Sequence, residues 1–116
     1  MRVASHSGLS ACIITFNEAD RIEACLRSVS FCDEIIVVDA HSTDGTREIL
    51  RELKRRIRTF YNDVNVGFAV AQNQAIRASG AEWVLTLNPD VLLLPGFVHA
   101  LVDAGDADPK AGLADV

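Results

Sequence analysis

The sequence predicts an α/β fold in which a mostly parallel sheet is covered by helices on both faces, giving three layers. Short apolar runs alternate with segments of helical periodicity from residue 9 to residue 104. The runs at 9–15 and 34–39 carry apolar residues at consecutive positions, as strands buried on both faces do. Strands that alternate with helices form parallel sheets through right-handed crossovers, and this order therefore favours a single α/β domain.

The first strand is predicted over Leu9–Thr15, and a helix follows it. Four apolar residues of this helix recur at helical spacing and form one stripe: Ile22, Cys25, Leu26 and Val29. We predict that Asn17 caps the helix and that the helix ends near Ser30. Residues 1–8 are expected to be a disordered leader, and the domain is expected to span residues 9–116.

The second strand is predicted over Glu34–Asp39, and a polar, turn-rich loop over 40–46 follows it. The next helix is expected to begin near Thr43 or Asp44, and we interpret Asp44 as its cap. The buried face of this helix is predicted to carry four aliphatic residues: Ile49, Leu50, Leu53 and Ile57. Four basic residues cluster near its end: Arg51, Lys54, Arg55 and Arg56. The helix dipole favours cations at that end, and a surface facing anionic lipid is the alternative interpretation.

A short third strand is predicted over Thr59–Tyr61, and an alanine-rich helix over Ala69–Ser79 follows it. The small side chains would let this helix lie close to the sheet. Asn73 falls on the same side of the helix as Ala69 and Ile76. We therefore predict that Asn73 faces a ligand rather than solvent.

The fourth strand, predicted over Trp83–Leu87, runs directly into Asn88-Pro89-Asp90. Because proline cannot donate a ladder hydrogen bond, the carboxylate follows the carboxyl end of the strand. A last helix is predicted over Pro95–Ala104, and a turn over 106–110. His99 lies on this helix among apolar neighbours, and we interpret it as packed or solvated rather than catalytic.

Polar side chains follow three of the predicted strands at the point where each strand ends: Asn17, Glu18, Asp39, Asn88 and Asp90. The carboxyl ends of parallel strands meet at one edge of a sheet, and ligands of open α/β sheets bind there. We therefore expect these side chains to form one polar pocket. A carboxylate at this edge can hold a divalent cation against a phosphate, and we predict a cation site at Asp90.

The composition argues against several classes of protein. The formal net charge of −5 at pH 7 argues against a nucleic-acid-binding protein, which normally carries a basic balance. Three cysteines without a C-x-x-C pair argue against a disulfide framework or a zinc site, and Cys12, Cys25 and Cys32 are expected to pack in the core. The apolar runs are too short to span a bilayer, and we expect a cytoplasmic location.

Two other α/β classes match the length but lack the residues they need. A dinucleotide-binding domain would carry a G-x-G-x-x-G loop after the first strand, but residues 15–20 contain no glycine. A phosphoacceptor receiver domain, a signalling module, would need an acidic pair after the first strand and a Lys after the fifth. Here the first strand ends in Asn17-Glu18, no Asp immediately follows the third strand, and Lys110 lies in a turn.

Four ordered motifs resemble the nucleotide-sugar-binding half of the family 2 glycosyltransferases, which have the GT-A fold. The motifs are LSACIITFNEADRIEACLRSV, DEIIVVDAHSTDGT, NVGFAVAQNQAI and WVLTLNPDVLLLPGF. The resemblance covers residues 9–104. It implies an inverting glycosyltransferase that transfers sugar from a nucleotide-diphospho-sugar, a UDP- or dTDP-sugar, to a cell-envelope glycan or lipid acceptor.

The resemblance also implies the site residues. The positions that match nucleotide-binding residues of the family are Thr15, Phe16, Asn17, Glu18, Asp39, Ser42, Asn73 and Asn88. The last position of the family's D-x-D motif falls on Asp90, which implies that Asp90 ligates Mg²⁺ or Mn²⁺ on the diphosphate. The first position is Asn88, whose amide brings no charge to the metal.

The chain is much shorter than the family's domain, whose second half supplies the acceptor site and the catalytic base. No catalytic residue is therefore assigned, and the chain is expected to be a truncated donor-binding half that is inactive alone. The missing strands would leave an exposed sheet edge, so we expect self-association, for example as a homodimer. Separately, we expect peripheral membrane contact of the full-length protein. The donor sugar stays open, because N-P-D and N-V-G-F resemble rhamnosyltransferases whereas the first half resembles lipopolysaccharide-core glucosyltransferases. The alternative function is a non-catalytic nucleotide-binding module.

Overall fold

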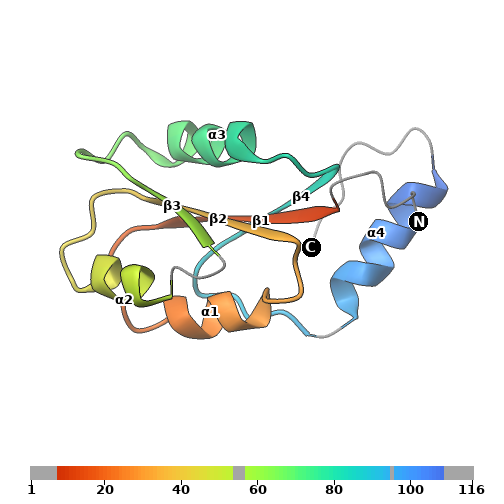
Figure 1. The fold of residues 1–116 in the computed structure, drawn as a ribbon, viewed down its shortest axis with the longest axis horizontal. Coiled ribbons are helices and arrows are strands. Elements are labelled where there is room, and N and C mark those ends of the chain that lie inside the picture. Colours follow the sequence, from red (N-terminus) through yellow and green to blue (C-terminus); the bar gives the residue numbers. More distant parts are fainter. Residues whose placement is uncertain (1–7, 54–56, 95, 109–116) are drawn as a thin grey trace.

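Strands and helices alternate along the chain, as predicted. The computed structural model describes residues 8–53, 57–94 and 96–108. The elements follow in the order β1 (Leu9–Thr15), α1 (Ile22–Ser28), β2 (Glu34–Asp39), α2 (Thr46–Glu52), β3 (Ile57–Tyr61), α3 (Phe68–Ala78), β4 (Trp83–Leu87) and α4 (Phe97–Ala107) (Figure 1). The α/β class is confirmed.

The described strands form one parallel sheet in the order β3-β2-β1-β4. β1 and β2 are central, and their last residues, Thr15 and Asp39, are paired in register. β4 lies on the other side of β1, with Leu87 opposite Ile13. The loops that leave β1, β2 and β4 therefore start at the same edge of the sheet.

Helices cover both faces of this sheet (Figure 1). α1 and α2 lie on one face, where side chains of alternate strand residues such as Ile13 and Val37 join Ile22 and Leu50 in the larger core cluster. α3 lies on the other face and packs Ala71 and Ala75 against the remaining strand residues: Cys12, Ile14, Ile36 and Val38. The predicted three-layer arrangement is therefore confirmed.

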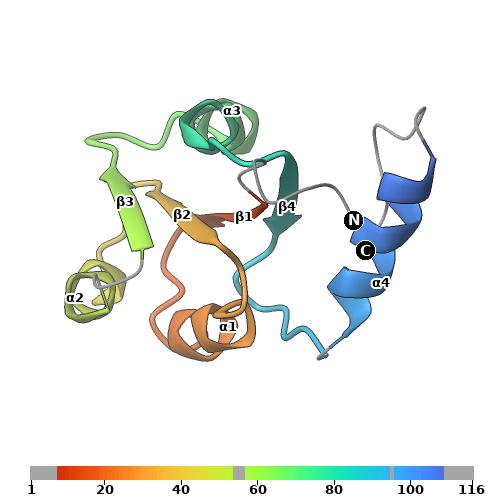
Figure 2. The ribbon, with the colours of Figure 1, turned by 45° about the vertical axis from the view of Figure 1, so that its right-hand side comes forward.

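α4 lies beside the β4 end of the sheet (Figure 2). The indole Nε1 of Trp83 donates a hydrogen bond to Asp106 Oδ1 at 2.8 Å, and Gly105 packs under the same ring. Asp106 was predicted in a turn, and this prediction is wrong because the contact with Trp83 extends the helix to Ala107. His99 is exposed and its ring lies 5.6 Å from that of Phe31, so the interpretation of a packed or solvated residue is confirmed.

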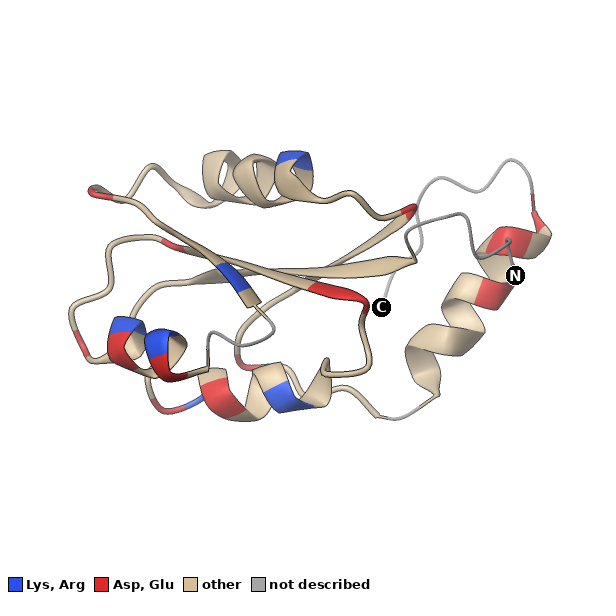
Figure 3. Cartoon of the chain, viewed as in Figure 1, with Lys and Arg blue, Asp and Glu red and all other residues tan. Residues whose placement is uncertain are grey.

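The boundary between α2 and β3 differs from the prediction. α2 begins at Thr46, later than predicted, because Gly45 before it has a φ of 101°, which is outside the helical region. Ile57 was placed on the buried face of α2, but it opens β3 and pairs with Ile35 of β2. Its β-branched side chain is suited to a strand. α2 carries both acidic and basic residues (Figure 3), and Lys54, Arg55 and Arg56 of the predicted basic cluster lie outside the described residues.

Asn17 does not cap α1, and that prediction is wrong. The helix begins at Ile22, and the residue at its N-cap position is Arg21. Asn17 has a φ of 55°, a left-handed conformation that Asn tolerates better than most residues. Its side-chain Oδ1 accepts a hydrogen bond from the N–H of Thr43 at 2.8 Å instead.

Asn73 points away from the sheet, contrary to the prediction. The inner face of α3 is set by Ala71 and Ala75, one helical turn apart. Asn73 lies two residues from each, on the opposite side of a 3.6-residue turn, and it is exposed together with Ala69 and Ile76. The three residues do share one side of the helix, but that side faces solvent.

The predicted leader falls mostly outside the described residues, which begin at Gly8. The carbonyl of Gly8 accepts a hydrogen bond from the N–H of Trp83 at 3.0 Å, so the prediction that Gly8 belongs to the leader is wrong. Pro95 and residues 109–116 also lie outside the described part of the chain. Within that part, none of the helices has the length and apolarity needed to cross a bilayer.

The three cysteines pack in the core, as predicted, and this has a testable consequence. The pKa of the thiol is raised to about 11 in Cys12 and Cys25 and to about 12 in Cys32, chiefly by burial and further by neighbouring carboxylates. The thiolate is the reactive form of cysteine. We therefore expect a thiol-specific reagent at neutral pH to label the native protein far more slowly than the protein in denaturant. Labelling of the native protein at the denatured rate would contradict this packing.

Candidate functional site

A pocket lies at the carboxyl edge of the sheet, between the loops after three strands and the beginning of α3. Its volume is about 320 Å³, within the range of small-molecule sites. Its described lining comes from the ends of β1, β2 and β4 and from the start of α3: Ile14, Phe16, Glu18, Ala40, Asn65, Gly67, Phe68, Asn88, Pro89 and Asp90. Of the five strand-end residues predicted to converge, Glu18, Asn88 and Asp90 line this pocket, whereas Asn17 and Asp39 are not among its described lining residues.

Two carboxylates of this pocket lie close to one buried thiol. The pKa of Cys25 is raised to about 11, first by burial and then by the charges of Asp90 and Glu18. The Cys25 thiol also contacts the carbonyl oxygen of Asn88 at 3.8 Å. Asp90 and Glu18 therefore both lie near Cys25 of α1, which also contacts the loop that follows β4.

The charges of the pocket are suited to a bridging cation. Among the described residues, the lining contains no Lys or Arg that could neutralise a phosphate. No group of three or more His, Cys, Asp or Glu side chains suitable for a metal ion occurs in the described ranges. Mg²⁺ and Mn²⁺ commonly bind through one or two carboxylates and complete their coordination with phosphate oxygens and water. Asp90 fits that pattern, whereas a closed metal site made of protein side chains alone does not.

Asp39 lies at the centre of a buried hydrogen-bond network rather than in the lining of the pocket. Its Oδ1 accepts hydrogen bonds from the hydroxyls of Thr15 at 2.8 Å and Ser42 at 2.6 Å. Its Oδ2 accepts from the N–H of Ser42 at 2.9 Å and from Nε of Arg47 at 2.6 Å. Burial alone would raise the pKa of Asp39, but these hydrogen bonds outweigh it and lower the pKa below its ordinary value.

The same network fixes the loop that follows β1 to the loop that follows β2. Ser42 Oγ accepts a hydrogen bond from the N–H of Asn17 at 2.9 Å, and Thr46 Oγ1 accepts one from the N–H of Glu18 at 2.9 Å. The prediction that Asp44 caps α2 is wrong, because Gly45 occupies the N-cap position; Asp44 instead accepts hydrogen bonds from the N–H of Thr46 and of Ala19. These bonds fix the backbone of the loop after β1, which carries the pocket residues Phe16 and Glu18.

The structure divides the predicted nucleotide-binding residues into three groups. Four predicted site residues line the pocket: Phe16, Glu18, Asn88 and the metal residue Asp90. Four belong to the hydrogen-bond network beside it, in which Asn17 is exposed and the others are buried: Thr15, Asn17, Asp39 and Ser42. Asn73 lies apart on the exposed face of α3 and is not among the described lining residues.

Sequence reasoning missed Arg47 and Phe68. Arg47 lies in the first turn of α2, where the helix dipole disfavours a cation, so its position indicated an anionic partner. That partner is Asp39, and the guanidinium also donates to the carbonyl of Asn62 at 2.6 Å. Phe68 carried no comparable signal, because an aromatic residue at the start of a helix is most often part of the core.

Comparison with known proteins gives the family of the chain. A family model described as "Glycosyl transferase family 2" matches residues 10–116. The chain belongs to glycosyltransferase family 2. This family 2 chain is 30% identical over 114 residues to N-acetylglucosaminyl-diphospho-decaprenol L-rhamnosyltransferase of Mycobacterium tuberculosis, with 85% of the chain and 37% of the relative covered. It is 28% identical over 111 residues to poly-beta-1,6-N-acetyl-D-glucosamine synthase of Staphylococcus aureus, with 90% and 27% covered.

Solved structures show the same fold. Mannosyltransferase PcManGT from Pyrobaculum calidifontis, in complex with GDP-Man and Mn²⁺, superposes with a TM-score of 0.79 at 29% identity and covers 90% of this chain and 33% of its own. Glucosyl-3-phosphoglycerate synthase from M. tuberculosis, with Mn²⁺ and UDP, has a TM-score of 0.70 at 25% identity and covers 85% and 39%. S. aureus TarS, at 23% identity and a TM-score of 0.76, supports the GT-A fold, with 86% of this chain and 32% of TarS covered.

The family 2 chain spans little more than a third of the rhamnosyltransferase it matches.

Proposed function

We propose that this chain binds the nucleotide-sugar donor of an inverting, metal-dependent glycosyltransferase. The observation that carries the proposal is the pocket at the carboxyl edge of the sheet, where Glu18 and Asp90 converge and no described Lys or Arg lines the wall. The mannosyltransferase and the glucosyl-3-phosphoglycerate synthase hold a nucleotide and Mn²⁺ on the same fold. This combination supports a nucleoside diphosphate bound through a divalent cation.

Asp90 is the residue that would hold the cation, and Mg²⁺ or Mn²⁺ would neutralise the diphosphate as it leaves the sugar. Asn88, two residues earlier, also lines the pocket and can hydrogen-bond a ribose hydroxyl or a phosphate oxygen. Phe16 is available to the base or ribose at the end of β1. Thr15, Asn17, Asp39 and Ser42 fix the loops that carry these residues.

We also propose the donor, the acceptor, the location and the oligomeric state of the protein. The donor is a UDP- or dTDP-sugar, and the acceptor is a cell-envelope glycan or lipid, in keeping with the rhamnosyltransferase and the polysaccharide synthase among the relatives. The protein acts in the cytoplasm, where the donors are made, with peripheral membrane contact of the full-length protein. Because β3 and β4 lie at the edges of the described sheet, we include a homodimer formed through an edge strand.

A panel of nucleoside diphosphates tests donor binding. We expect UDP or dTDP with Mn²⁺ to raise the melting temperature, since ligand at about 100 times its Kd adds about 2.7 kcal/mol to stability. GDP and ADP should raise it less, and Mn²⁺ alone should raise it little, because the described protein side chains offer few metal ligands. A folded sample that shows no shift with any of the four nucleotides would overturn the proposed function.

A further inference from the structure

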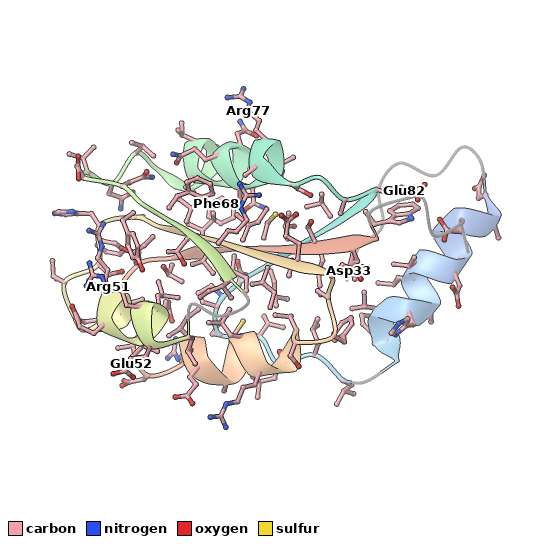
Figure 4. The ribbon with its side chains drawn as sticks, viewed as in Figure 1. Asp33, Arg51, Glu52, Phe68, Arg77 and Glu82 are labelled. Atoms are coloured by element: carbon pink, nitrogen blue, oxygen red, sulfur yellow. The ribbon has the colours of Figure 1, made fainter. Side chains whose placement is uncertain are left out.

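Phe68 is an aromatic side chain that the fold does not use. It is the first residue of α3 and 61% of its surface is exposed. It belongs to neither core cluster among the described residues, whereas Ala71 and Ala75 of the same helix are fully buried. It nevertheless lines the pocket, and Figure 4 shows it on the side of α3 nearest the strands.

The backbone before Phe68 is built to place it there. Gly67 has a φ of 89°, which residues with a side chain rarely adopt. The N–H of Gly67 donates to Asn65 Oδ1 at 2.9 Å, which closes a tight turn just before the helix. Asn65, Gly67 and Phe68 all line the pocket, so this turn forms one of its walls.

The sheet order separates this wall from Asp90. α3 packs on β1 and β2, and Ala40 directly follows β2. Asp90 follows β4, which lies on the other side of β1. The pocket therefore carries Phe68 on its β2 side and Asp90 on its β4 side, and Phe16 and Glu18, which follow β1, lie in between. A nucleoside diphosphate has the same polarity, with a flat base at one end and charged phosphates at the other.

We infer that Phe68 is the surface on which the nucleobase of the donor packs, and that it determines affinity for the base. This inference rests on the proposed function and assigns a residue to it. Phe16 offers a second aromatic surface, 48% exposed, on the neighbouring loop. Stacking on an aromatic side chain tolerates different bases, so Phe68 contributes affinity, and hydrogen-bonding groups must select the base.

The test compares Phe68→Ala with Val70→Ala, a matched truncation of another exposed apolar residue of α3 that is not among the described lining residues. Binding of a UDP-sugar, UDP, UMP and pyrophosphate, each with Mn²⁺, is measured by calorimetry. We expect Phe68→Ala to weaken UDP and UMP binding about tenfold each and to leave pyrophosphate binding unchanged. Phe68→Tyr should bind as the wild type does, and so should Val70→Ala.

Three results would overturn the inference. UDP and UMP binding unchanged in Phe68→Ala would show that the ring does not touch the base. Equal weakening of pyrophosphate would show a general disturbance of the pocket. Weakening of a UDP-sugar alone, with UDP and UMP unaffected, would place the ring against the sugar. A wild-type protein that binds none of these ligands would instead reject the proposed function itself, and the inference with it.

Discussion

Replacing Asp39 with alanine is expected to lower the free energy of unfolding by about 3–5 kcal/mol, measured by denaturant titration. The carboxylate is fully buried and accepts four hydrogen bonds, one of them from the guanidinium of Arg47. Alanine leaves that cation, whose side chain is only 19% exposed, without its partner. It also releases the two loops that the network holds together.

Asp39→Asn keeps the shape of the side chain at the centre of the network and removes its negative charge. The amide oxygen can replace Oδ2 and accept from the fixed N–H donors of Ser42 and Arg47. The amide nitrogen then faces two hydroxyls, of Thr15 and Ser42, which can turn and accept. We therefore expect a smaller loss, about 1–2 kcal/mol, because only the charge-assisted part of the bonds is removed.

Asp39→Asn and the wild type should also differ in their response to acid. The folded-state pKa of Asp39 lies below the ordinary aspartate value of 3.8, so the carboxylate contributes stability above that pH. That contribution decreases as the pH falls below about 4 toward the folded-state pKa. Asp39→Asn has no such group and should lose less stability than the wild type over that range. An equal acid response of the two proteins would contradict the role given to Asp39.

The strands were predictable because their pattern is local. Each buried strand is a short apolar run, and such a run at 9–15 or 34–39 leaves little choice of structure. The convergence of Glu18, Asn88 and Asp90 followed from topology alone, since parallel strands end at one edge. Family membership followed from the residues at those ends.

The errors fall where distant contacts decide the local structure. Asn17 adopts a left-handed conformation because its side chain and backbone bond to the loop after β2, a loop that is distant in sequence. Ile57 belongs to a strand because it pairs with β2, although its spacing fits the preceding helix. Asn73 was correctly grouped with Ala69 and Ile76, but that side of α3 is exposed, because small residues occur on both sides of the helix and only packing distinguishes them.

Asp90→Ala is expected to remove the metal-dependent part of nucleotide binding, which is the largest functional effect of a single substitution in this site. Without the carboxylate, the cation has lost its one assigned protein ligand, and the diphosphate faces a pocket that still contains Glu18. The additional thermal shift that Mn²⁺ gives with UDP should disappear, a loss of up to about 2.7 kcal/mol when ligand is near 100 times its Kd. Metal-free binding of the nucleotide should stay nearly intact.

Asp103→Ala on α4 is the matched control, because it removes an exposed carboxylate that is not among the described lining residues. It should leave both the metal-dependent and the metal-free shifts unchanged. If Asp90→Ala weakened the two kinds of binding equally, Asp90 would be a residue of the nucleotide pocket rather than a metal ligand.

Asn88→Asp tests the same site from the opposite direction. Asn88 lines the pocket and brings no charge, so the substitution adds a second carboxylate next to Asp90. The affinity of a site for a divalent cation rises with the number of its charged ligands. Mn²⁺ should therefore bind more tightly in the presence of UDP, whereas metal-free UDP should bind more weakly, because the new charge repels the diphosphate. If the cation binds in the pocket, the affinity for Mn²⁺ with UDP should rise while the affinity for metal-free UDP falls. If the cation only stabilises the fold at another place, the affinity for Mn²⁺ should not rise.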